Sequence, residues 1–477
     1  MDSQILIKTK IAKTIGFFTL VMINVAAVGG GVKNWPVLAV FGLASIAYIV
    51  LAALVFVIPV SLVSAELATG WPKAGGVFAW VKEAFGHRMG FLAIWLQWIE
   101  NVVWYPTILS FIAATIAYIF EPELADHKGY MLTLILLVFW VTTFVNLLGM
   151  RISGWISTAG VILGTFIPGA CIIGLGIDWF VSGNPLHIDF TWSNLVPQLT
   201  NPDHLAFFIG VLLGFAGLEM SAVHVLDVKN PQRNYPKALL LSVLIILFLL
   251  ILGVLSLAIV LPHSEISLVA GSLQAFASFT SAYGLNWLVP FMAAFIAVGA
   301  IGALSTWVVG PCKGLLAAAQ IGDLPPLFRQ INKKGMPITI LIFQALIVTA
   351  LSLVFLFMPT VSSGFWILSV LAAELYLVMY ILMFAACIKL RYLQPNTPRA
   401  YKIPGGKIGL WVVAGMGILS SSGAMIAGFI PPDFLSTGNT LTFVAFLLIG
   451  LIFFCALPSI ILRFQKPSWK KALEHEK

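Results

Sequence analysis

The stretch MINVAAVGGGV, residues 22–32, decides which fold this sequence predicts. It lies within an apolar run, residues 12–33, that is long enough to cross the hydrocarbon core of a bilayer as a helix. Its three consecutive glycines, Gly29 to Gly31, lower the free-energy cost of leaving helical geometry. Inside a membrane, unwound backbone persists only where it lines a cavity or is buried in protein. The stretch therefore predicts a spanning helix that is broken beside a cavity, unless the glycines serve only close helix packing.

The composition around this stretch is that of an integral membrane protein. Of the 477 residues, 60% are hydrophobic and only 9% are charged, whereas roughly a quarter of the residues in soluble domains are charged. Continuous apolar runs exclude the alternating pattern of a transmembrane β-barrel. We divide the chain into twelve spans: 12–33, 37–65, 88–120, 129–150, 154–181, 204–228, 237–262, 285–319, 337–358, 362–390, 408–430 and 439–463. The sequence thus predicts an all-α membrane protein with twelve transmembrane helices, forming one domain over residues 1–477.

The distribution of positive charge predicts how these spans are oriented. Of the 26 Lys and Arg residues, only Lys33 and Lys128 fall on the side opposite to the others. Because cytoplasmic loops are enriched in Lys and Arg, we expect both termini in the cytoplasm and the bundle in the inner (cytoplasmic) membrane. Topology thereby explains the net charge of +8, and nucleic acid is not expected as a partner.

A second interruption is predicted in the sixth span, which reads GVLLGFAGLEMSAVHV over residues 210–225. Gly214 and Gly217 precede the ionisable Glu219 there. Half-helices expose unpaired N–H groups at one end and C=O groups at the other, so a break can bind a carboxylate and an ammonium together. Spans one and six are five apart, as expected for two inverted repeats with the substrate site between their broken helices.

Three carboxylates, Glu100, Glu219 and Glu374, are expected near the middle of their spans. An ionised side chain at the bilayer centre costs at least about 2.5 kcal/mol on insertion scales, so such residues indicate function. The predicted spans place no Lys or Arg at comparable depth. Each carboxyl must therefore be protonated, hydrated, or neutralised by a substrate cation or a proton. His224, further along the sixth span, is a candidate for a pH response.

Most of these residues also have a structural interpretation. In the third span, WLQWIENVVWYP over residues 95–106, Glu100 belongs either to a functional site or, with Asn101, Trp98 and Trp104, to a hydrogen-bonded cluster between helices. Glu374 and His224 fit hydrogen bonds to a neighbouring helix equally well. Glu219, which directly follows the glycines of the predicted break, is the foremost candidate for binding the solute or a proton, with a structural hydrogen bond as the alternative.

Several blocks of the sequence resemble the amino acid, polyamine and organocation permease superfamily, and most closely its glutamate/γ-aminobutyrate antiporter family. These blocks are SAELATGWPKAGGVFAWV (64–81), GFAGLEMSAVHV (214–225), VKNPQRNYPKA (228–238), STWVVGPCKG (305–314), INKKGMPITI (331–340) and YKIPGGK (401–407). The resemblance implies a LeuT-like fold that works by alternating access. Two inverted five-helix repeats, residues 1–182 and 203–391, would be followed by helices 11 and 12 in residues 408–464.

The resemblance also implies positions for a substrate site. By motif, the candidate substrate-binding residues are Asn24, Ala27, Val28 and Gly29 in the first span, Phe215, Ala216 and Gly217 in the sixth, and Trp307 in the eighth. Trp98 and Asn101 join this set from the third span. The family's first-span pattern is glycine, small residue, glycine, and this chain departs from it with Ala27, Val28 and Gly29. Backbone contacts to a substrate carboxylate are correspondingly less favoured.

These patterns predict a secondary active antiporter that exchanges an amino acid for a related, decarboxylated amine. The alternative is a proton-coupled importer of cationic amines or polyamines, which three carboxylates would suit. A membrane enzyme is not expected, because no nucleophile with its base and no metal-ligand cluster occurs at membrane depth. An ion channel is disfavoured because twelve dissimilar spans form no symmetric pore. No cofactor is expected; the partners are a small solute, the lipid bilayer and protons, and the oligomeric state is left open.

Overall fold

The computed structural model describes residues 15–28, 32–72, 75–149, 160, 162–197, 202–220, 228–433 and 435–471. Within these ranges the chain is helical, and the β-structure consists of two isolated bridges. Nine helices of the described part are long and apolar enough to cross a membrane, and two shorter apolar helices, Ile167–Val181 and His204–Met220, accompany them. The prediction of an all-helical, multi-pass membrane protein is therefore confirmed.

The described part of the N-terminal half contains short and long helical segments. They are α1 (Phe17–Ala27), the 3₁₀ turn η1 (Val32–Asn34), α2 (Trp35–Ala39), α3 (Ala44–Ala52), the π-helical η2 (Ala53–Val57), α4 (Ile58–Gly70), α5 (Val77–Phe85), α6 (His87–Phe120), η3 (Pro122–Asp126), α7 (Lys128–Leu147), the π-helical η4 (Ile162–Phe166), α9 (Ile167–Val181) and α10 (Trp192–Leu195). Because α3, η2 and α4 follow one another without a gap, they form one long helix, Ala44–Gly70.

The C-terminal half contains most of the long helices. Its elements are α11 (Pro202–Gly214), α12 (Pro231–Val260), η6 (His263–Glu265), α13 (Gly271–Ala282), η7 (Asn286–Leu288), α14 (Val289–Gln320), η8 (Pro326–Arg329), α15 (Ile338–Ser352), α16 (Val354–Phe357), α17 (Val361–Leu393), α18 (Gly406–Gly428), α19 (Thr440–Arg463) and α20 (Pro467–Lys471). Apart from α13 and the shortest elements, these helices lie where the predicted spans place them.

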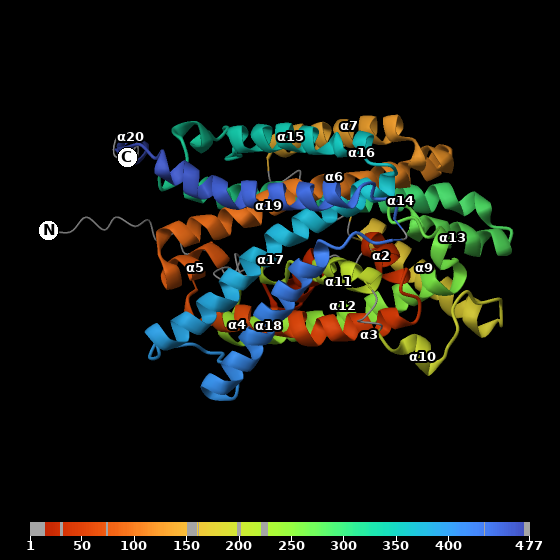
Figure 1. Cartoon of the computed structure of the whole chain (residues 1–477), viewed down its shortest axis with the longest axis horizontal. Helices are drawn as coiled ribbons and strands as arrows, with labels where there is room; N and C mark the ends of the chain where they lie inside the picture. The colour runs from red at the N-terminus through yellow and green to blue at the C-terminus, as the bar shows by residue number, and fades with distance from the viewer. Residues whose placement is uncertain are drawn as a thin grey trace.

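The centre of the bundle is built from α6, α14 and α17. Helix α6 packs along both of the others, and α6 and α17 are the most enclosed of the long helices (Figure 1). Helix α1 packs against α12, and α11 packs against α18 and α17. In Figure 1, α7 and α15 lie on one side of this centre, and α3, α4 and α12 lie on the other. The ends of α1 and α11 thus face a core that three long helices hold in place.

The outer helices present apolar side chains to their surroundings, as lipid contact requires. Helix α19 is the least enclosed of the spanning helices. The exposed large hydrophobic side chains include Phe18, Leu240, Phe248, Leu419, Ile426, Leu441 and Ile449. A soluble monomer rarely exposes apolar surface on this scale, because contiguous patches beyond a few hundred Å² favour association. The surface therefore agrees with a protein embedded in a bilayer.

The two ends of the bundle differ in charge. Figure 1 shows α5, the connection from α17 to α18 and α20 at one end, and α10 and α13 at the other. Basic residues at the first end include Lys82, Lys389, Arg391, Arg399, Lys402 and Lys407. This is the end that the positive-inside rule assigns to the cytoplasm. Gly75 and Gly76 both have positive φ directly before α5, so a turn that favours glycine leads into this helix.

The predicted boundary between the first two spans was wrong. We expected the first span to end at Lys33, but α1 is followed by η1 and by α2, which ends at Ala39. The turn lies further along the chain, at Gly42, where φ is +56° and glycine is favoured. The next helix begins only at Ala44. Lys33 consequently lies between two helical segments of the first span.

The sequence KNWP explains this error. Pro36 occupies the first turn of α2, where its missing N–H removes no intrahelical hydrogen bond. The predicted first span ended at Lys33, before Asn34, Trp35 and Pro36, whereas in the structure Pro36 begins a helical segment. The short α2 therefore returns the chain to helical geometry beyond the interruption.

Candidate functional site

A cavity of about 150 Å³ lies where the ends of α1 and α11 meet the middle parts of α6, α14 and α17. Its walls are mostly apolar, with Val37, Ile108 and Phe111 among the residues that line it. A closed apolar cavity of about this volume holds a molecule the size of benzene. The space therefore suits a small solute and excludes a peptide.

The first-span wall of the cavity is formed where α1 stops. Helix α1 ends at Ala27, and the N–H of Val28 donates to the Asn24 carbonyl at 3.1 Å. Val28 lines the cavity, as do Lys33 and Asn34 of η1. The end of α1 and the start of η1 thus place two polar side chains, Lys33 and Asn34, in the interior of the bundle.

The sixth-span wall has a similar construction. Helix α11 ends at Gly214, and residues 215–217 form a turn in which Gly217 has φ of +111°, a conformation that favours glycine. Gly214 and Ala216 line the cavity. The N–H of Gly217 points elsewhere and donates to the Tyr380 hydroxyl at 2.8 Å. Regular winding therefore stops on both sides of the same cavity.

Helix α6 supplies the acidic part of the wall. Glu100 and Asn101 line the cavity, and both are buried. The Asn101 amide donates to the Glu100 carboxylate and, at 2.8 Å, to the Gln97 carbonyl. These hydrogen bonds lie within α6, so they are not the predicted cluster between helices. Glu100 and Asn101 both face the cavity, and their role in substrate binding stays a prediction.

Glu219 lies behind the cavity wall and not in it. Its carboxylate accepts hydrogen bonds from Tyr376, at 2.5 Å, and from Tyr380. Tyr376 itself lines the cavity, and Glu219 is buried. A change in the charge of Glu219 would therefore reach the cavity through the Tyr376 hydroxyl.

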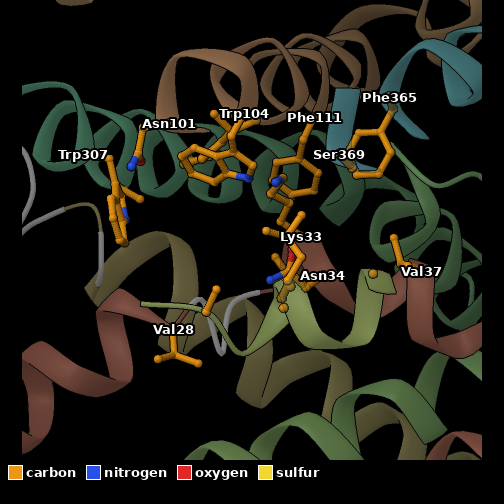
Figure 2. A pocket seen from close by; sticks show the side chains of 18 of the residues that line it. Val28, Lys33, Asn34, Val37, Asn101, Trp104, Phe111, Trp307, Phe365 and Ser369 are labelled. Atoms are coloured by element: carbon orange, nitrogen blue, oxygen red, sulfur yellow. The ribbon is translucent and has the colours of Figure 1, made fainter. Parts of the chain in front are cut away.

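Aromatic rings close the cavity on the side of α6 and α14. The Trp104 and Trp307 rings lie 6.1 Å apart, centroid to centroid, in an edge-to-face arrangement. The Tyr105 hydroxyl donates to the Trp307 carbonyl at 2.8 Å and ties α6 to α14. Figure 2 shows Asn101 and Trp307 on one side of the cavity and Phe365, Ser369 and Val37 on the other.

Lys33 corrects the prediction that no cation lies at the depth of the carboxylates. It lines the same cavity as Glu100. Its ammonium lies 4.5 Å from the centre of the Trp104 ring and 5.6 Å from that of Phe365, and it donates to the Thr107 hydroxyl at 3.4 Å. The error followed directly from ending the first span at this residue.

Four further predicted site residues that the structure describes do not line the cavity. Asn24 is fully buried on α1, and Phe215 is buried beside the turn of the sixth span. The Trp98 indole points away from the cavity and donates to the Gln344 side chain at 3.3 Å. Glu374 is buried on α17, next to Gly428 of α18. Gly29 and His224, and the side chain of Ala27, lie outside the described part of the structure.

Several lining residues were missed, although the sequence carries a signal for some of them. On α6 the residues that line the cavity are Glu100, Asn101, Trp104, Ile108 and Phe111, which follow the spacing of one helical face. Extending the face that Glu100 and Asn101 define together predicts Trp104 and excludes Trp98. Residues on α17, such as Ser369 and Tyr376, carry no comparable signal, because they depend on how that helix is rotated in the bundle.

The chain is similar to known transporters. The family model described as amino acid permease matches residues 15–454. An uncharacterized transporter of Legionella pneumophila is 46% identical over 94% of this chain and 96% of its own length. A glutamate/γ-aminobutyrate antiporter of Lactococcus lactis subsp. lactis is 34% identical over 94% of this chain and 89% of its own. A cadaverine/lysine antiporter of Escherichia coli is 29% identical over 69% of this chain and 68% of its own.

Proposed function

Because the chain belongs to the amino acid permease family, we propose that it exchanges an amino acid for a related, decarboxylated amine across the cytoplasmic membrane. The family and these relatives are transporters, so the chain is a membrane transporter and not an enzyme. The named relatives are antiporters for glutamate and γ-aminobutyrate and for cadaverine and lysine. In both pairs, one solute is the decarboxylated form of the other.

The observation that carries this proposal is a solute-sized cavity between two helix ends. Helices α1 and α11, which belong to spans one and six, both stop at its wall. Both ends are C-terminal, so they leave C=O groups without intrahelical partners, which suit the ammonium of a solute. A site between two corresponding helices allows access from either face in turn. The proposed architecture remains twelve helices with a LeuT-like pair of inverted repeats, 1–182 and 203–391, followed by 408–464.

Within this architecture, the residues take distinct roles in the proposal. Glu100 and Asn101 would receive the ammonium of the solute, and Trp307 would cover its carbon chain. Glu219 would couple the cavity to gating or to a proton, because Tyr376 joins its carboxylate to the wall by a hydrogen bond of 2.5 Å. The cytoplasmic location of both termini and the inner membrane remain parts of this proposal.

The alternative is a proton-coupled importer of cationic amines or polyamines. It is favoured by the two buried carboxylates near the cavity, Glu100 in its wall and Glu219 behind Tyr376. Such a carrier needs no solute on the far side of the membrane, whereas an exchanger does.

Counterflow in liposomes separates these two functions. Purified protein is reconstituted, the lumen is loaded with an unlabelled amino acid or amine, and uptake of the labelled partner is measured. An exchanger shows uptake that rises several-fold with a loaded lumen. Uptake that is independent of lumenal solute and is driven by a proton gradient would contradict exchange and support the importer.

A further inference from the structure

Lys33 is the one basic side chain that lines the cavity within the described part of the chain. It belongs to η1, the 3₁₀ turn that follows the end of α1 at Ala27, so its position is set by the fold. Desolvating an ammonium is unfavourable unless a counter-charge or several hydrogen bonds compensate it. A lysine ammonium in this cavity therefore needs groups that offset the cost of its desolvation.

The protein compensates this charge only in part. Among the described residues, no carboxylate oxygen lies within 4 Å of the Lys33 ammonium, and the Thr107 hydroxyl is its hydrogen-bond acceptor. The Thr107 hydroxyl donates its own hydrogen to the Trp104 carbonyl at 2.8 Å. Its oxygen therefore acts as the acceptor in the hydrogen bond with the Lys33 ammonium. An ammonium has three donors, so two remain for a ligand.

Aromatic rings hold the ammonium in place. The Trp104 and Phe365 rings both lie within 6 Å of it, and ring faces attract a cation, Trp most strongly. Figure 2 shows Lys33 between Trp104, Phe111 and Phe365, with Asn101 on the Trp307 side of the cavity. The wall thus carries a positive group and, at Glu100 beside Asn101, an acidic one.

We infer that Lys33 determines specificity by binding a carboxylate of the transported solute, whose ammonium lies toward Glu100. This inference rests on the proposed exchange and names the chemistry that its site accepts. Both exchanged solutes then carry a carboxylate as well as an ammonium. A diamine is rejected, because one of its ammonium groups would face Lys33 without a counter-charge.

The test compares matched solutes on matched variants in the reconstituted full-length protein. The solutes are an ω-amino acid, the carboxamide in which an uncharged amide replaces its carboxylate, and the diamine of equal length. Each solute is measured as an inhibitor of exchange. The variants are Lys33→Met, which keeps the length but not the charge, and Lys33→Arg, which keeps the charge. Lys128→Met is the control, because Lys128 donates to the Met358 carbonyl at 2.6 Å and does not line the cavity.

The wild type and Lys128→Met are expected to bind the acid about tenfold to a hundredfold more tightly than the carboxamide. Lys33→Met should lose this preference and gain affinity for the diamine, whereas Lys33→Arg should keep the preference. Equal binding of acid and carboxamide by the wild type, or an unchanged preference in Lys33→Met, would overturn the inference.

Two further readouts keep the test decisive. If Lys33→Met does not fold, the acid and carboxamide are compared on the wild type and Lys33→Arg alone. If the wild type exchanges none of the solutes, the proposed exchange fails, and thermal stabilisation of the purified protein still reports whether the acid binds more tightly than the carboxamide. Exchange of diamines in preference to the acid would overturn the role of Lys33 and leave exchange itself intact.

Discussion

Two buried charges in this protein are treated in opposite ways. Glu66, on α4, accepts hydrogen bonds from the guanidinium groups of Arg391 and Arg399, the latter at 3.0 Å, and from the Ile403 N–H at 2.9 Å. Lys33 has one hydroxyl and two aromatic rings within the described structure. The Glu66 carboxylate is compensated by positive groups of the protein, whereas the Lys33 ammonium has one hydrogen-bond acceptor and no carboxylate partner among the described residues.

This difference separates a structural ion cluster from a binding site. Removing one partner from a fully compensated cluster leaves the others buried without counter-charge, so such a cluster fixes helices in place. Arg391 and Ile403 flank the connection between α17 and α18, and Glu66 fastens that connection to α4. An ammonium with free hydrogen-bond donors in a cavity is instead complementary to an acceptor group on a solute that binds and dissociates. The two sites should therefore respond differently to loss of charge.

The largest effect is expected at the compensated site. Glu66→Gln should lower the free energy of unfolding by about 3–5 kcal/mol, because the buried Arg399 and the partly buried Arg391 lose their carboxylate. Thermal or denaturant unfolding of the detergent-solubilised protein measures this loss. Glu123→Gln, at an exposed position in η3, is the control and should stay close to wild type. A Glu66→Gln protein as stable as this control would contradict the structural role.

Glu219 lies between these two extremes, since two tyrosine hydroxyls compensate it without an opposite charge. Glu219→Gln replaces one acceptor oxygen with a donor, so one tyrosine loses its partner, and Tyr376 is the one that reaches the cavity. We expect exchange to fall about tenfold or more, in keeping with 1–3 kcal/mol for an unsatisfied buried group. Any pH dependence carried by this carboxyl should disappear.

Exchange measured across a pH series tests this prediction. Tyr376→Phe is the matched variant, because it removes one hydrogen bond to Glu219 and keeps the carboxyl, so pH dependence should persist while the rate falls. Unchanged uptake by Glu219→Gln at every pH would exclude it as the coupling residue and shift attention to Glu100.

The sequence predicted most of the helices but only part of the cavity. Long apolar runs fix where helices such as α6 and α17 lie, because hydrophobic burial and backbone hydrogen bonding in lipid leave few alternatives. The glycines before Glu219 likewise marked where α11 stops. Which side chains meet in the interior depends on helix rotation and packing, and Tyr376 illustrates this, since nothing local marks it as part of the wall.

Lys33 shows a different limit of prediction from sequence. Hydropathy assigns a lysine followed by asparagine and proline to a loop, because an isolated cation in lipid is unfavourable. In the folded protein the Lys33 ammonium is stabilised inside the bundle because it lies in a cavity, against the Trp104 ring and the Thr107 hydroxyl. The position of Pro36 in the first turn of α2 was the available clue, as a proline there starts a helix as readily as it ends one.

The smallest effect on stability is expected at Lys33, and it is the sharpest test of the contrast with Glu66. In Lys33→Met, the loss of the cation–π contact with Trp104, worth about 0.5–2 kcal/mol, opposes the gain from no longer burying an ammonium that has one described acceptor. The free energy of unfolding should therefore stay within about 1 kcal/mol of wild type, in the assay used for Glu66→Gln. A loss of about 3–5 kcal/mol, equal to that expected for Glu66→Gln, would show that Lys33 supports the fold as Glu66 does. In that case Lys33 would be a structural residue and not one whose ammonium binds the solute.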